Sequence, residues 1–450
     1  MNTWLNAVVG ARCIVPLRVT LLICLALLVQ PIAAQEECVP ADGEPIVLGA
    51  IFPEGNLLTR RDGDAYQGAE AMRQAINACG GVNGHPVEFM YEPANDRDDA
   101  AEAAQHLIDA GVPLIVGSGS QAVSEGAREV TEAAGVVFWE MTEALDDAGE
   151  WSFSSRPTNE FLGSRTAQIV TALAHPTLGI TDGIQSRIAL VYEDRPRGQQ
   201  VASGVLQALG RSDQELTIEY PYSDTLFNAY ELAERIRDED IDILILSMFD
   251  EDAENLWYAL REANASVGAW IHIGSQGYHH ELCERGGNMQ GFISVDASGP
   301  VNDEYRREAM GELYTQYLRA YLNENGTDPD VEADLSASGV YLLWRYILPF
   351  VDGAYIASTI RSTIVTVRWD LTSPNAAGGA TGMMSQGGYD VTSGGFVLSD
   401  VIVRQQQGSF FCSVWPEEIA TCAVGVQPFP TWRERALLEQ NPAICTGDGI

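Results

Sequence analysis

The segment that most constrains the fold is Val112–Glu140, which holds a strand, a Gly/Ser turn, a helix and a second strand in succession. Its apolar run VPLIV is typical of a buried parallel strand, and valine and alanine then recur at helical spacing. In the intervening GSGSQ turn, Gly117 and Gly119 have no side chain to hold a ligand away from the backbone. Because the helix's first N–H groups lie at the positive end of its dipole, the pattern predicts a carboxylate or phosphate site. An empty tight turn is the alternative interpretation.

The same alternation of strand and helix fills residues 46–140. IVLGAIF and VEFMYE have the composition of strands, and helices are expected at Asp64–Ala78 and Asp98–Ala110. Strand and helix in strict alternation predict a doubly wound α/β fold with a parallel sheet. Ligands of such a sheet bind beyond the carboxyl ends of its strands.

A second series of the same kind follows a Pro-containing stretch at Arg156–Asn159. The expected strands are RIALVY, ELTIEY, IDILILSM, AWIHIG and GFISV, and the expected helices are Gly198–Leu209, Ala229–Asp238 and Asp252–Ala263. The helical regions Asn302–Asn325 and Leu335–Phe350 have no strand between them, so we expect them to return and cover the first lobe. VTVRW and GFVLSDVIVRQQQGSFFC are then expected to form strands.

The chain begins with the pattern of a secretory signal peptide over residues 1–34. Arg12 and Arg18 precede the apolar run Val19–Val29, and small residues precede Gln35. An uncleaved membrane anchor is the alternative, but the apolar run is too short to span a bilayer. We therefore expect a periplasmic or secreted protein that is soluble after cleavage of the signal.

Charge and composition exclude several function classes. The formal net charge is −37, so the surface should repel nucleic acid and anionic lipid. Every basic residue is arginine, which rules out a P-loop lysine, a lysine Schiff base and a Ser-x-x-Lys hydrolase. Adaptation to high salt and a GC-rich genome explain the missing lysine equally well.

The cysteines suggest disulfides rather than a metal. After removal of the signal peptide the remaining cysteines are Cys38, Cys79, Cys283, Cys412, Cys422 and Cys445. An even number in an exported chain predicts three bridges and no free thiol, with Cys412 and Cys422 the nearest pair and the other connectivity open. His279 and His280 beside Cys283 have the composition of a zinc site, but one short cluster is a weak signal and we predict no metal and no cofactor.

Several segments together resemble a known family. VLGAIFPEG, DGDAYQGAEAMRQAINACGGVNGHPVEF, LIVGSGSQAVSEGAREVTEAAGV and FSSRPTNEF are similar to type I periplasmic binding proteins, specifically the branched-chain amino-acid-binding family of ABC importers. The resemblance covers about Pro45–Phe410. It implies two Rossmann-like lobes with parallel sheets joined by hinge crossovers, with lobe 1 formed by residues 44–157 plus 297–382 and lobe 2 by 158–296 plus 383–410. Residues 411–450, rich in cysteine and proline, have no counterpart and their role is open, and we expect residues 413–450 to form an irregular, disulfide-held tail.

The resemblance also implies a set of ligand-binding residues. These are Gly119, Ser120 and Gln121 at the turn, Thr142 after the next strand, and Arg197, Phe249 and Gln276 in the second lobe. Arg197 stands where the family has an aromatic residue, and Gln276 stands where it has an acid that receives the ligand's ammonium. Since glutamine cannot neutralise an ammonium, a ligand with additional carboxylate or amide character fits better. A solvated Arg197, a turn residue at Gln276 and a packing role for Phe249 are the alternatives.

We therefore expect a monomeric, non-enzymatic binding protein that delivers a small polar solute to an ABC transporter permease. A ligand-sensing subunit of a membrane receptor is the alternative within the same fold. A dinucleotide-dependent enzyme is a rival, because Gly117-x-Gly119-x-x-Ala122 opens a helix and Glu140 ends the next strand, where a ribose-binding acid would lie. A hydrolase is weaker, since the chain contains no Gly-x-Ser-x-Gly motif.

Overall fold

A computed structural model describes most of residues 38–438, which belong to one compact unit. The described ranges are 38–54, 62–142, 149–180, 185–212, 214–223, 227–274, 289–296, 311–327, 329, 331–366, 387–390, 396–399, 401–408, 410–417 and 420–438. None of the helices in these ranges combines the length and apolar character needed to cross a bilayer.

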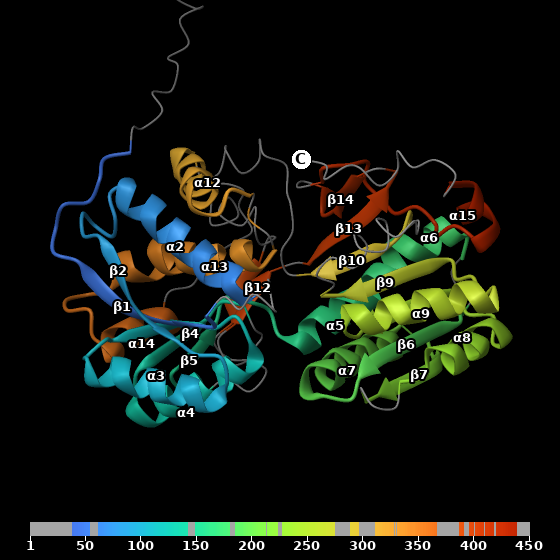
Figure 1. Cartoon of the computed structure of the whole chain (residues 1–450), viewed down its shortest axis with the longest axis horizontal. Coiled ribbons are helices and arrows are strands. Elements are labelled where there is room, and N and C mark those ends of the chain that lie inside the picture. Colours follow the sequence, from blue (N-terminus) through green and yellow to red (C-terminus); the bar gives the residue numbers. More distant parts are fainter. Residues whose placement is uncertain are drawn as a thin grey trace, which may run out of the picture. The chain divides into compact units, whose positions relative to one another are not determined.

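Two seven-stranded sheets form the framework (Figure 1). In the first sheet the strand order is β11-β12-β5-β4-β3-β1-β2. The strands are β1 (Ile46–Phe52), β2 (Val87–Pro93), β3 (Leu114–Gly117), β4 (Val137–Glu140), β5 (Ser152–Ser154), β11 (Gly387–Asp390) and β12 (Phe396–Ser399). All neighbours pair in parallel except β11 and β12, which are antiparallel. The doubly wound sheet expected from the sequence is confirmed here.

Helices cover both faces of the first sheet (Figure 1). One face packs against α2 (Asp62–Ala78), α12 (Glu312–Asn325), α13 (Val331–Leu342) and α14 (Ala357–Thr366), and the other against α3 (Arg97–Asp109) and α4 (Gln121–Ala134). A π turn (Leu343–Ile347) and a 3-10 turn (Leu348–Phe350) follow α13. The packing of α12 and α13 on α2 confirms that the helices after residue 302 return to the first lobe.

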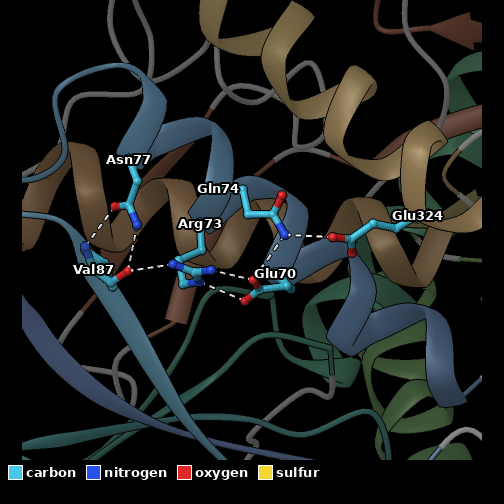
Figure 2. Close-up of polar contacts among 6 residues, drawn as sticks. All are labelled: Glu70, Arg73, Gln74, Asn77, Val87 and Glu324. Carbon is cyan, nitrogen blue, oxygen red and sulfur yellow. Dashed lines mark hydrogen bonds and ion pairs between the residues drawn. The ribbon is translucent and has the colours of Figure 1, made fainter. Parts of the chain in front are cut away.

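The GAEAMRQAINACGGVNG segment fixes α2 to its neighbours. Polar side chains on one face of α2 hydrogen-bond to the start of β2 and to α12 (Figure 2). Asn77 exchanges two 2.8 Å hydrogen bonds with the Val87 backbone, and Gln74 donates to Glu324 at 2.9 Å. At Gly68 an added Cβ would lie 2.1 Å from the Ala333 carbonyl oxygen, so glycine permits the close approach of α13.

The second sheet has the strand order β14-β13-β10-β9-β8-β6-β7. Its strands are β6 (Ile188–Glu193), β7 (Leu216–Tyr222), β8 (Ile243–Ser247), β9 (Ala269–Ile273), β10 (Ile293–Asp296), β13 (Ile402–Gln407) and β14 (Phe410–Trp415). The first five pair in parallel, and β13 and β14 add an antiparallel edge. This is a second doubly wound sheet, as expected from the sequence.

Helices also cover both faces of the second sheet. One face packs against α5 (Asn159–Ile169), a π turn (Val170–Ala174), α6 (His175–Leu178) and α7 (Pro196–Arg211). The other packs against α8 (Ala229–Asp238), α9 (Asp250–Ala263) and the segment before α15 (Trp432–Leu438). In that segment Phe429 stacks on Trp270 with ring centroids 5.7 Å apart.

The structure corrects three expectations about the C-terminal third. Strands β11 and β12 pair in the first sheet, so the chain passes to the second sheet after Ser399 and not at the expected boundary of 382 and 383. The tail from residue 411 is not wholly irregular, because β14 completes the second sheet and α15 follows. Val365 and Thr366, expected to begin a strand, end α14, and residues 367–369 of VTVRW lie outside the described residues.

In the described part of the chain, two disulfides close local segments, one beside each sheet. Cys38–Cys79 ties the start of the described chain to the end of α2, and Cys412–Cys422 ties β14 to the following loop. The second pair was expected from the sequence and is confirmed. Cys283 and Cys445 lie outside the described residues, so their pairing stays a prediction.

Candidate functional site

The expected anion site is the turn between β3 and α4. Gly119 adopts φ +90°, a conformation that glycine reaches without strain, and Ser120 caps the helix with its Oγ accepting from the Val123 N–H at 3.4 Å. Within the described part of the chain, the N–H groups of Ser120, Gln121 and Ala122 meet no acceptor. These three donors, at the positive end of α4, can receive an anion.

A buried carboxylate, Glu140 at the end of β4, organises this turn from behind. Its Oε1 accepts from the N–H groups of Ser118, Met141 and Thr142 at 2.9–3.0 Å, and its Oε2 accepts from the Ser118 hydroxyl at 2.8 Å. The residue is fully buried. Glu140 therefore holds the turn after β3 against the turn after β4. Its buried oxygens are not accessible to a ribose, as the acid of a dinucleotide enzyme would have to be.

The Thr142 hydroxyl corrects the expected role of Gly119. Its oxygen accepts from the Gly119 N–H at 2.7 Å and donates to Glu140 Oε1 at 3.3 Å. The Gly119 N–H is thus already engaged inside the protein. One lone pair remains on the hydroxyl, so Thr142 can offer a ligand an acceptor but no donor.

Arg156 connects the carboxyl edges of the two sheets. Its Nη1 donates to the Thr142 carbonyl oxygen, and its Nη2 forms a 2.9 Å ion pair with Asp296 at the end of β10. Both side chains of the pair are largely buried, at 12% and 5% exposure. This arginine therefore brings Thr142, a candidate from the first lobe, close to the carboxyl edge of the second sheet.

Arg197 lies at that second edge. It belongs to the first turn of α7, and its guanidinium reaches over Gly274, at the end of β9. A Cβ added to Gly274 would lie 2.2 Å from Arg197 Nη2 and 4.0 Å from Asp296 Oδ2. Since Gly274 also has φ +70°, glycine is needed there both for its backbone and for the space that Arg197 occupies. Arg197 is half-buried, which disagrees with a freely solvated loop residue.

Phe249 lies at the start of α9 and is 40% exposed, so it is not a core residue. The Arg195 guanidinium lies 5.2 Å from the centroid of its ring. The backbone N–H of Phe249 donates to the Tyr222 hydroxyl at 3.3 Å, and that hydroxyl donates to Asp252 at 2.9 Å. Burial, with Asp252 nearby, raises the pKa of Tyr222, so the hydroxyl stays protonated. Phe249 thus presents a partly open aromatic face at the carboxyl end of β8.

Titratable groups at the second edge are strongly affected by burial. Burial, together with the charge of Arg197, lowers the pKa of His272 to about 3, and the contact with the Met248 carbonyl oxygen and the charge of Asp296 oppose this change. Burial also lowers the pKa of Arg404, opposed by the charge of Asp296. His272 is therefore neutral at physiological pH, and Asp296 is a counter-charge for the arginines around it.

Two candidates from the sequence stay untested by geometry. Gln276 and the group of His279, His280 and Cys283 lie outside the described residues. In the described part of the chain, no three His, Cys, Asp or Glu side chains are arranged to hold a metal ion. We did not expect from the sequence that Glu140, Arg156 and Asp296 organise the site. The two acids are the last residues of the apolar strands VFWE and ISVD, and this position could have indicated them.

Comparison with known proteins agrees with this architecture. The sequence model described as "Periplasmic binding protein" matches residues 46–390, so the chain belongs to the periplasmic binding protein family. It is 23% identical over 293 residues to Leu/Ile/Val-binding protein homolog 8 of Brucella abortus (strain 2308), covering 63% of this chain and 71% of that protein. The type I periplasmic binding protein fold expected from the resemblance is thereby confirmed.

Solved structures share this fold. An ABC transporter substrate-binding protein from Desulfitobacterium hafniense in complex with Leu matches with a TM-score of 0.62 at 18% identity, over 82% of this chain and 100% of that one. A solute-binding protein of an ABC transporter from R. palustris in complex with benzoate matches with a TM-score of 0.57 at 13% identity, over 86% and 98% of the two chains.

Proposed function

We propose that this protein is an extracytoplasmic solute-binding protein that captures a small polar, carboxylate-bearing solute between its lobes and delivers it to an ABC importer. The observation that carries the proposal is the set of donors at the start of α4, where Ser120, Gln121 and Ala122 present N–H groups at the positive end of the helix. Leucine and benzoate, the ligands named for two structural neighbours, have a carboxylate in common. No covalent chemistry is needed, and we expect a monomer released by signal cleavage after Ala34.

The second lobe completes the proposed site. Arg197 and Phe249 face the solute from this side, Gln276 stays a prediction from the resemblance, and the Gly119 N–H acts only through Thr142. Presentation of the same bound state to a membrane receptor is the alternative use. The dinucleotide-dependent enzyme is disfavoured because the Glu140 carboxylate is buried and already accepts several hydrogen bonds.

A thermal-shift screen of amino acids, amides, ureas and dicarboxylates tests the proposal. A solute at 100 times its dissociation constant should raise the free energy of unfolding by about 2.7 kcal/mol. If no solute of these classes raises the unfolding temperature, the proposed function is wrong.

A matched pair of variants at one position tests the anion site itself. Gln121 is the first residue of α4 and follows Ser120, whose φ of −156° and ψ of 152° suit a residue before proline. Gln121→Pro removes one backbone N–H, whereas Gln121→Ala keeps it. We expect calorimetric affinity for the best solute of the screen to fall about tenfold or more in the proline variant, because a charge-assisted hydrogen bond is lost. Equal affinities of the two variants would place the carboxylate elsewhere.

A further inference from the structure

Three arginines from distant parts of the chain lie around one carboxylate at the edge of the second sheet. Arg156 pairs with Asp296 Oδ1 at 2.9 Å, and Arg197 extends over Gly274 toward Asp296 Oδ2. Arg404 of β13 is close enough to Asp296 for the carboxylate to oppose the effect of burial on its pKa. Arg156 and Arg197 thus approach Asp296, while Glu193 at the end of β6 is a second buried carboxylate of this edge.

Arg404 is the most buried of the three arginines, with 5% of its surface exposed. Its Nη2 donates to the Ser294 hydroxyl at 3.2 Å, and its guanidinium lies 4.9 Å from the centroid of the Phe411 ring. Its Nε meets no acceptor within the described residues. Because Ser294 and Phe411 are neutral, Asp296 is the one described carboxylate that acts on this charge.

Arg197 carries the second unbalanced charge. In the described part of the chain no acceptor is hydrogen-bonded to its guanidinium, although the side chain is half-buried and confined by Gly274. His272 cannot supply a negative charge and is neutral in this environment. A partly desolvated guanidinium gains most from a planar anion that accepts two parallel hydrogen bonds.

We infer that the solute has a second anionic group, most simply a second carboxylate, and that Arg197 binds it at the carboxyl edge of the second sheet. Arg156 is a positioning residue in this arrangement, because its ion pair engages Asp296 Oδ1 and competes with Arg197 for that carboxylate. The inference rests on the proposed function and narrows its solute class to small dicarboxylates, with one end on the α4 N–H groups and the other on Arg197.

The test uses pairs of solutes that differ by one charge at nearly constant shape. These pairs are succinate and its monoamide, glutarate and its monoamide, and L-glutamate and L-glutamine. For the wild-type chain, calorimetry should give at least one dicarboxylate an affinity about tenfold to a hundredfold above that of its amide partner, since a hydrogen bond to a charged group is lost in the amide. The difference should decrease as salt concentration rises.

Variants then assign the difference to one side chain. Arg197→Gln should abolish the preference for the dicarboxylate, and Arg197→Lys should restore part of it, because lysine keeps the charge but loses the planar fork. Arg211→Gln changes the exposed arginine at the other end of α7 and should leave the preference intact. Circular dichroism and unfolding temperature verify that each variant is folded.

The outcomes separate this inference from the proposed function. If leucine or another monocarboxylate binds the wild type while every dicarboxylate binds no better than its amide, the inference fails and solute binding stands. A preference that persists in Arg197→Gln overturns the assignment to Arg197. If no member of the pairs and no monocarboxylate binds, both proposals fail together.

Discussion

A buried carboxylate lies opposite the other lobe's edge in each sheet, Glu140 in the first and Asp296 in the second, beside the buried Glu193 that ends β6, and the partners of Glu140 and Asp296 differ. At the first edge Glu140 accepts from backbone N–H and hydroxyl groups, whereas at the second edge Asp296 faces arginines. Neutral donors arranged by Glu140 can hold any carboxylate in a fixed geometry. Fixed cations around Asp296 discriminate by charge. The difference suggests that the first lobe supplies affinity and the second supplies selectivity.

Arg156 makes the two edges dependent on each other. It donates to the carbonyl of Thr142, whose hydroxyl orients the first edge, and it pairs with Asp296 in the second. The selectivity of the second lobe for a ligand therefore depends on the geometry of the turn in the first lobe.

The largest expected effect is the loss of stability on removing the disulfide beside each sheet. Cys38–Cys79 closes a span of 41 residues beside the first sheet, and Cys412–Cys422 closes a span of 10 residues beside the second. On the chain-entropy account, replacing both cysteines of a pair by alanine should cost about 4 kcal/mol for the first and about 3 kcal/mol for the second. Urea unfolding of the two double variants measures this order, and a greater loss for Cys412→Ala/Cys422→Ala would contradict it.

The next effect tests whether Glu140 organises the first edge. Glu140→Ala leaves the buried N–H groups of Ser118 and Thr142 without their acceptor, which should lower the free energy of unfolding by about 3 kcal/mol. Denaturant titration gives the value. Glu129→Ala is the control, because Glu129 lies on the exposed face of α4 and, among the described residues, pairs with the exposed Arg97 alone. Similar midpoints for Glu140→Ala and the control would show that the first edge is held by other contacts.

Much of this fold could be predicted from local pattern alone. The buried strands of both sheets are short apolar runs, and the α4 unit carries its own cap, turn and helical spacing. Helix α5 was not predicted, and part of its packing on α7 depends on glycine, which has no apolar side chain to show helical spacing. A Cβ on Gly163 would lie 2.0 Å from the Val201 carbonyl oxygen, and one on Gly204 would lie 1.9 Å from that of Glu160.

The remaining errors concern contacts between distant segments. The sequences of β11 and β12 do not indicate which sheet they join, and the pairing of β12 with β5 and of β11 with β12 assigns them to the first. The contacts of Arg156 with Asp296 and of Arg404 with Ser294 likewise join segments more than a hundred residues apart. At the first edge, the resemblance indicated both Gly119 and Thr142 as candidates. It could not indicate the hydrogen bond between them, which engages the Gly119 N–H inside the protein.

The smallest expected effect concerns acid sensitivity at the second edge, where His272 is fully buried and its ring nitrogen is 2.9 Å from the Met248 carbonyl oxygen. Its pKa of about 3 in the folded protein is below the ordinary 6.5, so the unfolded chain binds the proton more readily. The stability that His272 contributes is therefore fully present above pH 6.5 and is lost as pH falls toward 3. By pH 5 the loss should be about 2 kcal/mol. We expect unfolding free energies measured from pH 7.5 to pH 5 to decline less steeply in His272→Gln, which keeps an N–H donor for Met248, than in the wild type. Parallel curves would mean that His272 accepts a proton in the folded state, and the second edge would then gain positive charge in acid.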